Sequence, residues 1–286
     1  MTDAPARPRP APFVGEVLRV ERLSASLVRV VVGGPGLAAF EPSPHADSYV
    51  KLVFLPPAAG TDRPLRADGR LDLDAVRATL PPDQQPRQRS YTVRGFADGE
   101  LTLDLVVHGD AGLAGPWADR AAPGDEVLLV GPGGAWSPDG SAASHLLVGD
   151  LSALPAIAVA LERLPADAVG HVVVEVHGPE DEIPLDAPTD VHVHWVHLGD
   201  GSPGPALVER VNALPELPGP VSAFVHGEAG AVRDLRRHLR LDRGITREQL
   251  SVSGYWRLGA DDEGWRATKR TWLAGIEESE LAAGLV

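Results

Sequence analysis

The sequence predicts two domains of different architecture: a small antiparallel β-barrel, then a doubly wound parallel α/β sheet that ends in a C-terminal helix. From Phe13 to about Pro132, apolar residues recur at every second position, which is the period of a half-buried strand. Further along, short apolar runs alternate with helical segments, as in a parallel sheet. A chain of 286 residues allows two domains, so we place the barrel at 13–136, the α/β domain at 143–286 and a flexible tail at 1–12.

Six short strands with little helix predict the barrel. The expected strands are Phe13–Leu23, Ser26–Val32, Tyr49–Leu55, Arg89–Arg94, Leu101–His108 and Glu126–Val130. A long Pro-rich connection lies between Pro56 and Gln88, with one possible helical turn around Leu73–Leu80. Connections of this length are often lids or disordered segments. Gly131-Pro132-Gly133-Gly134 is expected to be a turn that leaves the barrel.

Alternating strands and helices predict the second domain, with about five parallel strands. The expected strands are His145–Val148, His171–His177, Val191–Val196, Ala223–His226 and Leu250–Trp256. The expected helices are Leu151–Leu164, Pro205–Leu214 and Ala229–Leu241, the first with Ser152 as its N-cap and Pro155 in its first turn. A docked C-terminal helix is expected because one helical face would carry Trp265, Thr268, Lys269, Trp272 and Ile276.

Composition excludes several classes of function. The net charge of −14 argues against general binding to nucleic acid or to anionic membranes. The chain has no cysteine, so disulfides, thiol chemistry and cysteine-held iron–sulfur clusters are excluded. No apolar run is long enough to span a membrane. The N-terminal residues lack the apolar middle of a signal peptide, so we expect a cytoplasmic protein.

The stretch Arg89-Ser90-Tyr91-Thr92-Val93-Arg94 has residue types that suit a flavin. Arg89 offers a forked donor set for phosphate oxygens, and Tyr91 offers a flat ring for the isoalloxazine. Thr92 brings a hydroxyl and a backbone N–H to the polar edge of the ring. The alternative is an ordinary half-buried strand with solvated arginines.

A glycine-rich loop follows the fifth expected strand, from His108-Gly109 to Gly115-Pro116-Trp117-Ala118. Glycines let the backbone approach a ligand closely. Pro116 at a first helical position would leave backbone N–H groups facing a phosphate. The alternative is a plain turn into a short helix with Trp117 as a core aromatic.

Two strands of the α/β domain end in polar turns that contain glycine, Gly149-Asp150-Leu151-Ser152 and His226-Gly227-Glu228-Ala229-Gly230. Ligands of doubly wound sheets bind at such carboxyl ends, where the strand order reverses. Neither turn has the G-x-G-x-x-G spacing of dinucleotide sites. His192 and His194 are expected on one face of their strand and His197 on the other, an arrangement that favours surface histidines over a metal site.

Taken in order, these stretches resemble the siderophore-interacting proteins, which belong to the ferredoxin-reductase-like flavoenzymes. The resemblance covers about residues 13 to 273. It rests on the barrel with R-x-Y-T-x-R and on five further stretches: Asp47-Ser48-Tyr49-Val50-Lys51-Leu52, the His108-Gly109 and Gly115–Ala118 loop, Gly149-Asp150-Leu151-Ser152-Ala153-Leu154-Pro155-Ala156-Ile157, Gly227-Glu228-Ala229 and Ser253-Gly254-Tyr255-Trp256-Arg257.

The resemblance implies an FAD-dependent ferric-siderophore reductase that takes electrons from NAD(P)H and releases Fe(II) from the chelate. It assigns no catalytic residue. The implied FAD-binding residues are Arg89, Ser90, Tyr91, Thr92, Val107, His108, Gly115, Pro116, Trp117, Ala118, Asp150, Ser152, Ala153, Tyr255 and Trp256. Gly227 and Glu228 are implied for NAD(P)H, and Lys51 and Arg257 for the anionic ferric siderophore.

This chain departs from the family at two places. Leu151 stands where relatives often carry an acidic residue, and the turn at 131–134 lacks the Arg that many carry. These departures put the charge and affinity of the substrate in question more than flavin binding. A flavin reductase with another acceptor, or a siderophore carrier without turnover, remain alternatives.

Ferredoxin is a less favoured electron donor, because docking an acidic ferredoxin requires a basic face and this chain is acidic. Arg233, Arg236 and Arg237 follow the second polar turn, and one of them could reach the 2′-phosphate of NADPH. The alternative is a solvated helix face paired with Asp234.

Overall fold

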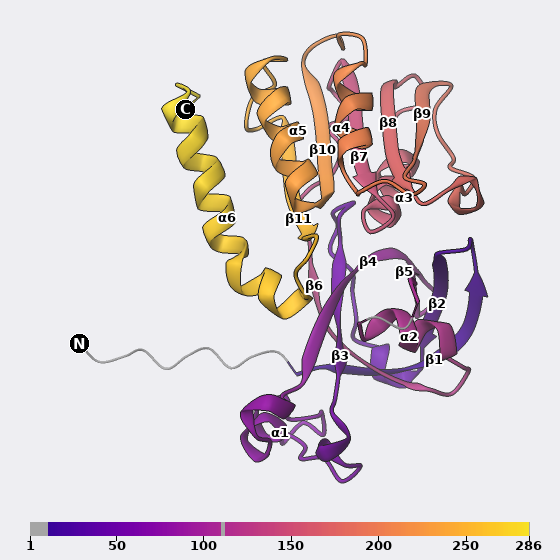
Figure 1. Cartoon of the computed structure of the whole chain (residues 1–286). Helices are drawn as coiled ribbons and strands as arrows, with labels where there is room; N and C mark the ends of the chain where they lie inside the picture. Colours follow the sequence, from indigo (N-terminus) through magenta and orange to yellow (C-terminus); the bar gives the residue numbers. More distant parts are fainter. Residues whose placement is uncertain (1–10, 110–111, 286) are drawn as a thin grey trace.

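The structure is a computed structural model that describes residues 11–109 and 112–285. The barrel and the parallel sheet are stacked end to end, and the long C-terminal helix α6 runs beside the sheet from the level of the barrel (Figure 1). Both predicted architectures are therefore confirmed. No helix within the described ranges is long and apolar enough to cross a membrane.

The first domain is a closed antiparallel barrel with the strand order β1-β2-β5-β4-β3-β6. Its strands are β1 Phe13–Arg22, β2 Leu27–Gly33, β3 Tyr49–Phe54, β4 Arg87–Ala97, β5 Glu100–Val106 and β6 Glu126–Gly133. Alternate residues point inward, so leucine and valine side chains such as Leu101, Leu103 and Leu105 fill the interior. The strands β4 and β6 are longer than predicted, and residues 131–133 belong to β6 rather than to a turn.

The short helix α2 (Ala114–Arg120) packs on the barrel core through Ala114 and Ala118. Trp117 makes an edge-to-face contact with Phe54, so it is a packing aromatic in this structure. The expectation that Pro116 opens this helix is wrong: the helix begins at Ala114, and Pro116 is its third residue. A proline is still accommodated there, because the first-turn N–H groups have no intrahelical partner.

The connection between β3 and β4 folds against the outside of the barrel. It contains α1 (Leu73–Thr79), as the helical turn predicted, capped by the Asp72 carboxylate. Leu71, Leu73 and Val76 are buried against Val53 of β3 in a separate apolar cluster. A connection with its own core is better described as a small subdomain than as a lid or a disordered segment.

The second domain is a parallel sheet of five strands in the order β11-β10-β7-β8-β9. Its strands are β7 Ser144–Asp150, β8 Val169–Val176, β9 Asp190–His197, β10 Val221–Glu228 and β11 Leu250–Trp256. The helix α3 (Leu154–Glu162) covers one face, and α4 (Pro205–Asn212) and α5 (Ala229–Leu241) cover the other. The sheet is thus doubly wound, with its switch point between β7 and β10.

The predicted start of the first helix in this domain is wrong. The helix α3 begins at Leu154, and its N-cap Ala153 makes no side-chain capping bond. Ser152 does not cap the helix, because its N–H and hydroxyl both donate to the Asp150 carboxylate and hold a tight turn there. Pro155 lies in the first turn, as expected.

The helix α6 (Asp262–Ala282) docks through Trp265 and Ile276, which are both buried, and through Trp272, which packs on the sheet core. Thr268 was expected on the same face but is exposed. Its hydroxyl instead donates to backbone carbonyls of the preceding turn.

Polar contacts fix the barrel against the sheet. The Asp181 carboxylate is fully buried and accepts hydrogen bonds from Ser24 and Ser26 of the barrel. Arg94 of β4 pairs with Glu162 of α3. A buried carboxylate with several donors holds its partners in one geometry, so the barrel has a fixed position against the sheet.

Candidate functional site

Asp150 organises the switch point of the sheet. Its Oδ2 accepts hydrogen bonds from the Glu228 backbone N–H at 2.9 Å and from the Trp256 indole N–H at 2.7 Å. Its Oδ1 accepts two bonds from Ser152. Burial raises the pKa of Asp150, while these hydrogen bonds favour the ionised form. One carboxylate thus ties together the ends of β7, β10 and β11.

Gly227 is required beside this carboxylate. A Cβ at Gly227 would lie 2.5 Å from the Asp150 Oδ2, and its φ of +141° is one that other residues rarely adopt. Gly149 is equally constrained, because a Cβ there would lie 2.7 Å from the His226 carbonyl oxygen. Close packing at the switch point therefore already requires glycine at both positions that were expected in a nucleotide site.

The Glu228 carboxylate is already engaged in the fold. It caps α5 by accepting from the Ala231 N–H at 2.9 Å, and it accepts from the Leu258 N–H at 3.1 Å. Each oxygen of this carboxylate already accepts one backbone hydrogen bond, so an expected contact with NAD(P)H would have to use the Glu228 backbone or a remaining lone pair of the carboxylate.

Three aromatic rings pack beneath the end of β11. His226 stacks on Phe224 with ring centroids 3.7 Å apart, and Tyr255 meets the His226 ring edge-on at 5.0 Å. Burial holds the pKa of His226 well below its ordinary value. A neutral imidazole thus packs against Tyr255 at the end of β11.

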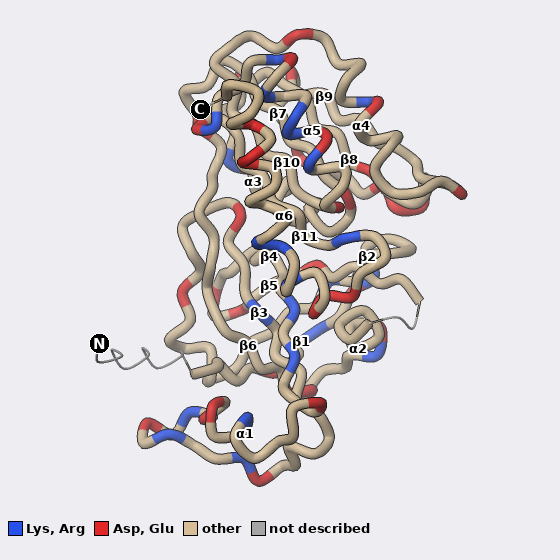
Figure 2. The backbone as a smooth tube through the Cα atoms, turned by 60° about the vertical axis from the view of Figure 1, so that its left-hand side comes forward, with Lys and Arg blue, Asp and Glu red and all other residues tan. Residues whose placement is uncertain are grey.

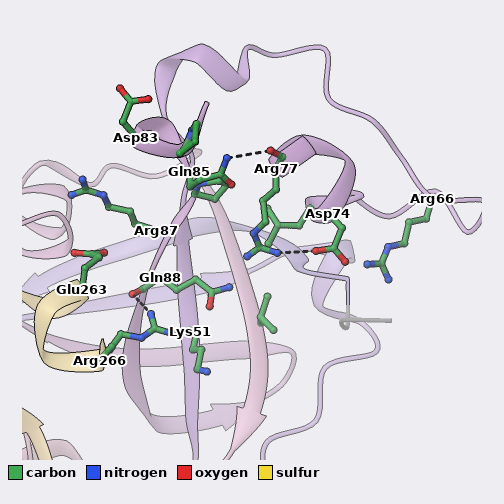
Figure 3. Close-up of a pocket in the computed structure, with 14 residues that line it drawn as sticks. Lys51, Arg66, Asp74, Arg77, Asp83, Gln85, Arg87, Gln88, Glu263 and Arg266 are labelled. Carbon is green, nitrogen blue, oxygen red and sulfur yellow. Dashed lines mark hydrogen bonds and ion pairs between the residues drawn. The ribbon is translucent and has the colours of Figure 1, made fainter. Parts of the chain in front are cut away.

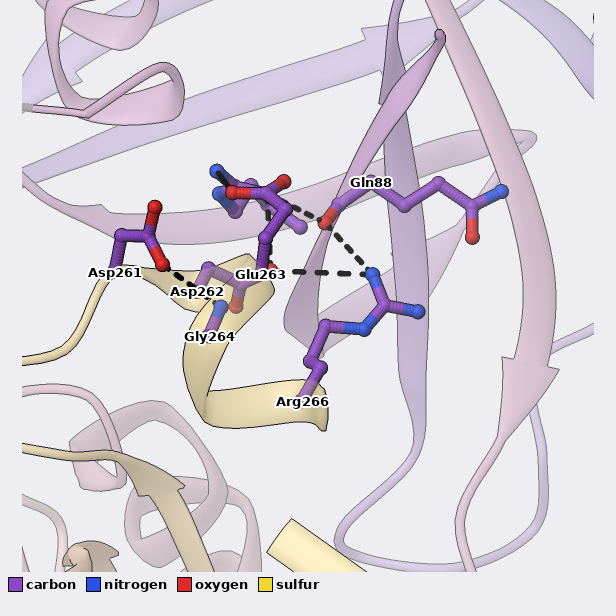
Figure 4. A network of polar contacts seen from close by, with 7 residues as sticks. Gln88, Asp261, Asp262, Glu263, Gly264 and Arg266 are labelled. Atoms are coloured by element: carbon purple, nitrogen blue, oxygen red, sulfur yellow. Dashed lines mark hydrogen bonds and ion pairs between the residues drawn. The ribbon is translucent and has the colours of Figure 1, made fainter. Parts of the chain in front are cut away.

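Arg89 of β4 is bound by the first turn of α6. Its guanidinium donates to Glu263 at 2.8 and 3.0 Å and to Asp262 at 2.9 Å. Figure 4 shows these carboxylates directed at β4, with Arg266 of the same turn bonded to the Gln88 carbonyl. Although burial opposes it, the hydrogen bond that Arg89 donates to Glu263 raises the pKa of Arg89, which stays charged. Sequence reasoning missed both acidic partners; the only signal was the acidic run Asp261-Asp262-Glu263 ahead of a helix.

The rest of the motif lies along the same strand. Tyr91 packs against the barrel core, and burial raises its pKa well above the ordinary value. Thr92 is buried beside it, whereas Ser90 is exposed. The strand therefore offers a fixed aromatic and a fixed hydroxyl.

The glycine-rich loop meets the end of β5 closely. A Cβ at Gly115 would lie 3.4 Å from the Val106 carbonyl and 3.6 Å from the Val107 Cα. The first turn of α2 therefore rests on Val107 and His108, the residues expected beside it. Part of this loop, at 110–111, lies outside the described residues.

Lys51 lines a cavity of about 960 Å³ on the outer side of the barrel, which we call the α1 cavity (Figure 3). Its walls come from β3, β4, β6, the subdomain that contains α1, and the start of α6. Arg257, the other residue expected at the substrate, is exposed and does not line this cavity. Two cations that sequence reasoning missed, Arg87 and Arg266, do line it.

The arginines expected near a 2′-phosphate have different environments. Arg236 is buried and makes a bidentate ion pair with Glu280 of α6 at 2.6 and 2.7 Å, so it is neither solvated nor directed at a ligand. Arg233 pairs with Asp234, as the alternative expected. Arg237 is exposed.

The histidines of β9 pair with protein groups. His194 lies 3.0 Å from the His171 ring nitrogen and accepts from Arg210, and the His192 ring packs on His171 from the same side. His197 bonds to Glu182 instead. No group of three metal-binding side chains was found in the described ranges.

Two family profiles cover most of the chain. Residues 16–136 match the siderophore-interacting FAD-binding domain, and residues 142–259 match the siderophore-interacting protein domain.

Curated relatives are similar over nearly their full length. The uncharacterized protein Rv2895c of Mycobacterium tuberculosis is 45% identical over 89% of this chain and 93% of its own. The ferric vibriobactin reductase ViuB of Vibrio cholerae is 32% identical, covering 89% and 92%. The NADPH-dependent ferric-chelate reductase of Escherichia coli is 28% identical, covering 84% and 91%.

Solved structures agree with both the family and the fold. The siderophore-interacting protein SipS of Aeromonas hydrophila superposes with a TM-score of 0.74 at 32% identity, over 92% of this chain and 98% of that one. A ferredoxin reductase of carbazole 1,9a-dioxygenase, at 17% identity and a TM-score of 0.60 over 86% of this chain and 70% of its own, shares the fold alone. The barrel, the doubly wound sheet and the two matched domains together place this chain in the siderophore-interacting protein family.

Proposed function

We propose that this protein is an FAD-dependent ferric-siderophore reductase that uses NAD(P)H and works in the cytoplasm. One observation carries the proposal: a single short segment connects both halves of the expected flavin site. Trp256 donates to Asp150 at the switch point, and Glu263, seven residues later, binds Arg89 on the barrel. The Trp256–Asp150 and Glu263–Arg89 contacts therefore tie the barrel motif and the sheet edge to the same segment, as a cofactor that contacts both domains would require.

The residues present fit a flavin. Tyr91 and Tyr255 supply aromatic rings from the barrel and the sheet. The pyrophosphate would bind Arg89 and the first turn of α2, from Gly115 to Ala118. The ring would lie along Ser90, Tyr91 and Thr92, facing Tyr255 and Trp256. When bound, the flavin would accept a hydride and supply single electrons to Fe(III).

Reduction of Fe(III) to Fe(II) would release iron from its chelator. Oxygen-rich chelators hold hard Fe(III) far better than the softer Fe(II), so adding one electron loosens the complex. The protein would hold the chelate within reach of the flavin and exclude water from the cleft. Lys51 and Arg257 are the expected partners of the anionic chelate.

A nicotinamide nucleotide is the proposed electron donor. It would bind outside the carboxyl ends of β7 and β10, along Asp150, Ser152, Ala153, Gly227 and Glu228. The name of the Escherichia coli relative supports NADPH as a donor, although Arg236 is committed to Glu280. Basic and acidic positions are interspersed along the backbone, including in the α1 region, which does not favour docking of an acidic ferredoxin (Figure 2).

Flavin titration tests the proposal against its alternatives. The expected result is saturable quenching of FAD fluorescence and a yellow protein with bands of oxidised flavin. A reductase with another acceptor would also bind FAD, but would reduce ferric chelates no faster than free reduced flavin does. A siderophore carrier would bind the chelate without flavin, and an absence of FAD binding would rule out both enzyme alternatives.

A further inference from the structure

The half of the parallel sheet that contains β8 and β9 has an unusual charge pattern. From Leu164 to Glu209 the chain contains no lysine or arginine, although this stretch includes both strands and the loops that follow them. The first cation beyond it, Arg210 of α4, donates to a ring nitrogen of His194 on β9 at 2.7 Å. This part of the sheet therefore offers an anion neither lysine nor arginine.

Carboxylates already occupy the N-termini of the two helices that cover one face of the sheet. Glu175 at the end of β8 is buried, and both its oxygens accept from the Gly204 N–H at the start of α4, at 3.0 and 3.1 Å. Glu228 at the end of β10 caps α5 through the Ala231 N–H. Helix N-termini bind phosphate through backbone N–H groups that lack partners. A phosphate that approached α4 or α5 would instead meet a carboxylate.

The arginines of α5 do not compensate for these acids. Arg236 is buried in its ion pair with Glu280, and Arg233 pairs with Asp234. Arg237 is exposed, but it lies roughly 12 Å along the helix from the first residue of α5. None of the three is both unpaired and close to the carboxyl edge of the sheet.

Asp200 is an exposed acid of the loop that joins β9 to α4. Backbone bonds hold this loop: the Leu198 N–H donates to the Val176 carbonyl at 2.8 Å, and the Gly201 N–H donates to the Leu198 carbonyl at 2.9 Å. Among the described residues, the Asp200 carboxylate has no hydrogen bond or ion pair. It therefore adds an uncompensated negative charge at the carboxyl edge of the sheet, where doubly wound folds bind nucleotides.

We propose that this edge selects NADH over NADPH, with Asp200 as the residue that determines the selectivity. The inference rests on the proposed reductase function and names its electron donor. In doubly wound folds an acid near the second strand suits the ribose 2′-hydroxyl of NADH, whereas an arginine accommodates the 2′-phosphate of NADPH. Glu175 ends the second strand here but is engaged by α4, so Asp200 on the neighbouring loop is the exposed acid.

The two nucleotides differ only in the 2′-phosphate, which adds about two negative charges near neutral pH. The pyrophosphate is common to both and does not affect the choice. Repulsion between the 2′-phosphate and the carboxylates of this edge should therefore weaken the binding of NADPH alone, and salt should screen it.

Redox-inactive nucleotides test the selectivity without turnover. We would titrate the FAD-loaded protein by calorimetry with tetrahydro-NAD and, in parallel, with tetrahydro-NADP, whose partly saturated nicotinamide rings give no hydride. The variant is Asp200→Arg. Asp190→Arg is the matched control, because Asp190 is also exposed and begins the same strand at the opposite end of the sheet.

The wild type should bind tetrahydro-NAD about tenfold more tightly than tetrahydro-NADP, and the difference should shrink as salt rises. Asp200→Arg should improve the binding of tetrahydro-NADP by about tenfold and leave that of tetrahydro-NAD nearly unchanged. Asp190→Arg should keep the preference of the wild type. Equal affinities in the wild type, unchanged selectivity in Asp200→Arg, or the same shift in Asp190→Arg would overturn the proposal.

The same proteins separate this inference from the proposed function. If the wild type prefers tetrahydro-NAD but reduces no ferric chelate with NADH, the reductase function fails and the selectivity stands. If NADH and NADPH support chelate reduction with the same KM, the function stands and the selectivity fails. If neither analogue binds, the nucleotide donor and the selectivity both fail.

Discussion

Two arginines on the same strand, Arg87 and Arg89, have opposite surroundings. Arg89 is held by two carboxylates of α6, at 2.8 to 3.0 Å. Arg87 faces the α1 cavity without a hydrogen bond or an ion pair to any described residue. Both are arginines on one barrel strand, but the carboxylates of α6 hydrogen-bond Arg89 and act on Arg87 only through the charge of Glu263.

The comparison shows that a motif does not by itself make a cation available to a ligand. A phosphate that binds Arg89 must compete with Asp262 and Glu263 or share the guanidinium with them, whereas no carboxylate is hydrogen-bonded to Arg87 among the described residues. The first turn of α6 therefore affects both regions: it neutralises the motif arginine and contributes Arg266 to the cavity.

The largest effect is expected at the motif. Arg89→Ala should weaken FAD binding by tenfold to more than a hundredfold, because a charge-assisted bond to phosphate contributes about 1.5–3 kcal/mol. Flavin fluorescence titration measures it, and Arg19→Ala is the control. Unchanged affinity in folded Arg89→Ala protein would mean that Arg89 serves only to anchor α6.

A smaller effect is expected in the cavity. Lys51→Ala should raise the KM for an anionic ferric chelate by about fivefold and leave flavin content unchanged, because the lysine contributes a half-buried, solvent-screened charge. Steady-state kinetics at low and high salt would show the effect shrinking as the charges are screened. An equal rise with a neutral ferric chelate would contradict an electrostatic role.

Removing a carboxylate that competes for Arg89 should increase the affinity for FAD. Glu263→Gln should tighten FAD binding by about twofold to fivefold, since partly exposed ion pairs contribute roughly 0.2–1 kcal/mol. Glu277→Gln, which removes an acid of α6 paired with Arg247, is the matched control and should change nothing. Weaker FAD binding in Glu263→Gln would show that the carboxylate positions Arg89 for the cofactor instead of competing with it.

The smallest effect concerns pH. The hydrogen bond from Arg89 lowers the pKa of Glu263 below its ordinary value of 4.5. The pair therefore stabilises the fold fully above that value and loses its effect as the pH falls towards the lower folded pKa. The Tm of the wild type should exceed that of Glu263→Gln by roughly 1–3 °C near neutral pH, and this difference should close as the pH falls. A Tm difference that widens as the pH falls would contradict the stabilising role of the ionised Glu263.

Sequence patterns predicted local structure well where a segment determines its own ends. The helix Ala229–Leu241 and the strand Leu250–Trp256 have the predicted limits, because a glutamate cap precedes the helix and the strand is a short run bounded by polar residues. The start of α3 was mispredicted because Ser152 satisfies Asp150 rather than the helix. Glu228 and Trp256 bind the other oxygen of Asp150, and they reach it only in the folded sheet.

The sequence predicted which residues belong to the candidate site, but not which residues they contact. The contact between Arg89 and Glu263 joins positions 174 residues apart, so no local pattern could reveal it. The α1 cavity likewise requires the connection between β3 and β4 to fold back on the barrel, which its proline-rich sequence did not indicate. Only the assembled fold identifies Arg87 and Arg266 as neighbours of Lys51.

Anaerobic stopped-flow measures whether this protein passes electrons from a nicotinamide nucleotide through FAD to a ferric chelate. FAD-loaded protein is mixed with excess NADH or NADPH, and then with an anionic ferric chelate, while the oxidised-flavin band is followed. At least one nucleotide should bleach the band, and the chelate should restore it as Fe(II) is released to a ferrous trap. A band that neither nucleotide bleaches over minutes, while reduced ferredoxin does, would contradict the proposed donor; a reduced flavin that the chelate cannot reoxidise would contradict the reductase function itself.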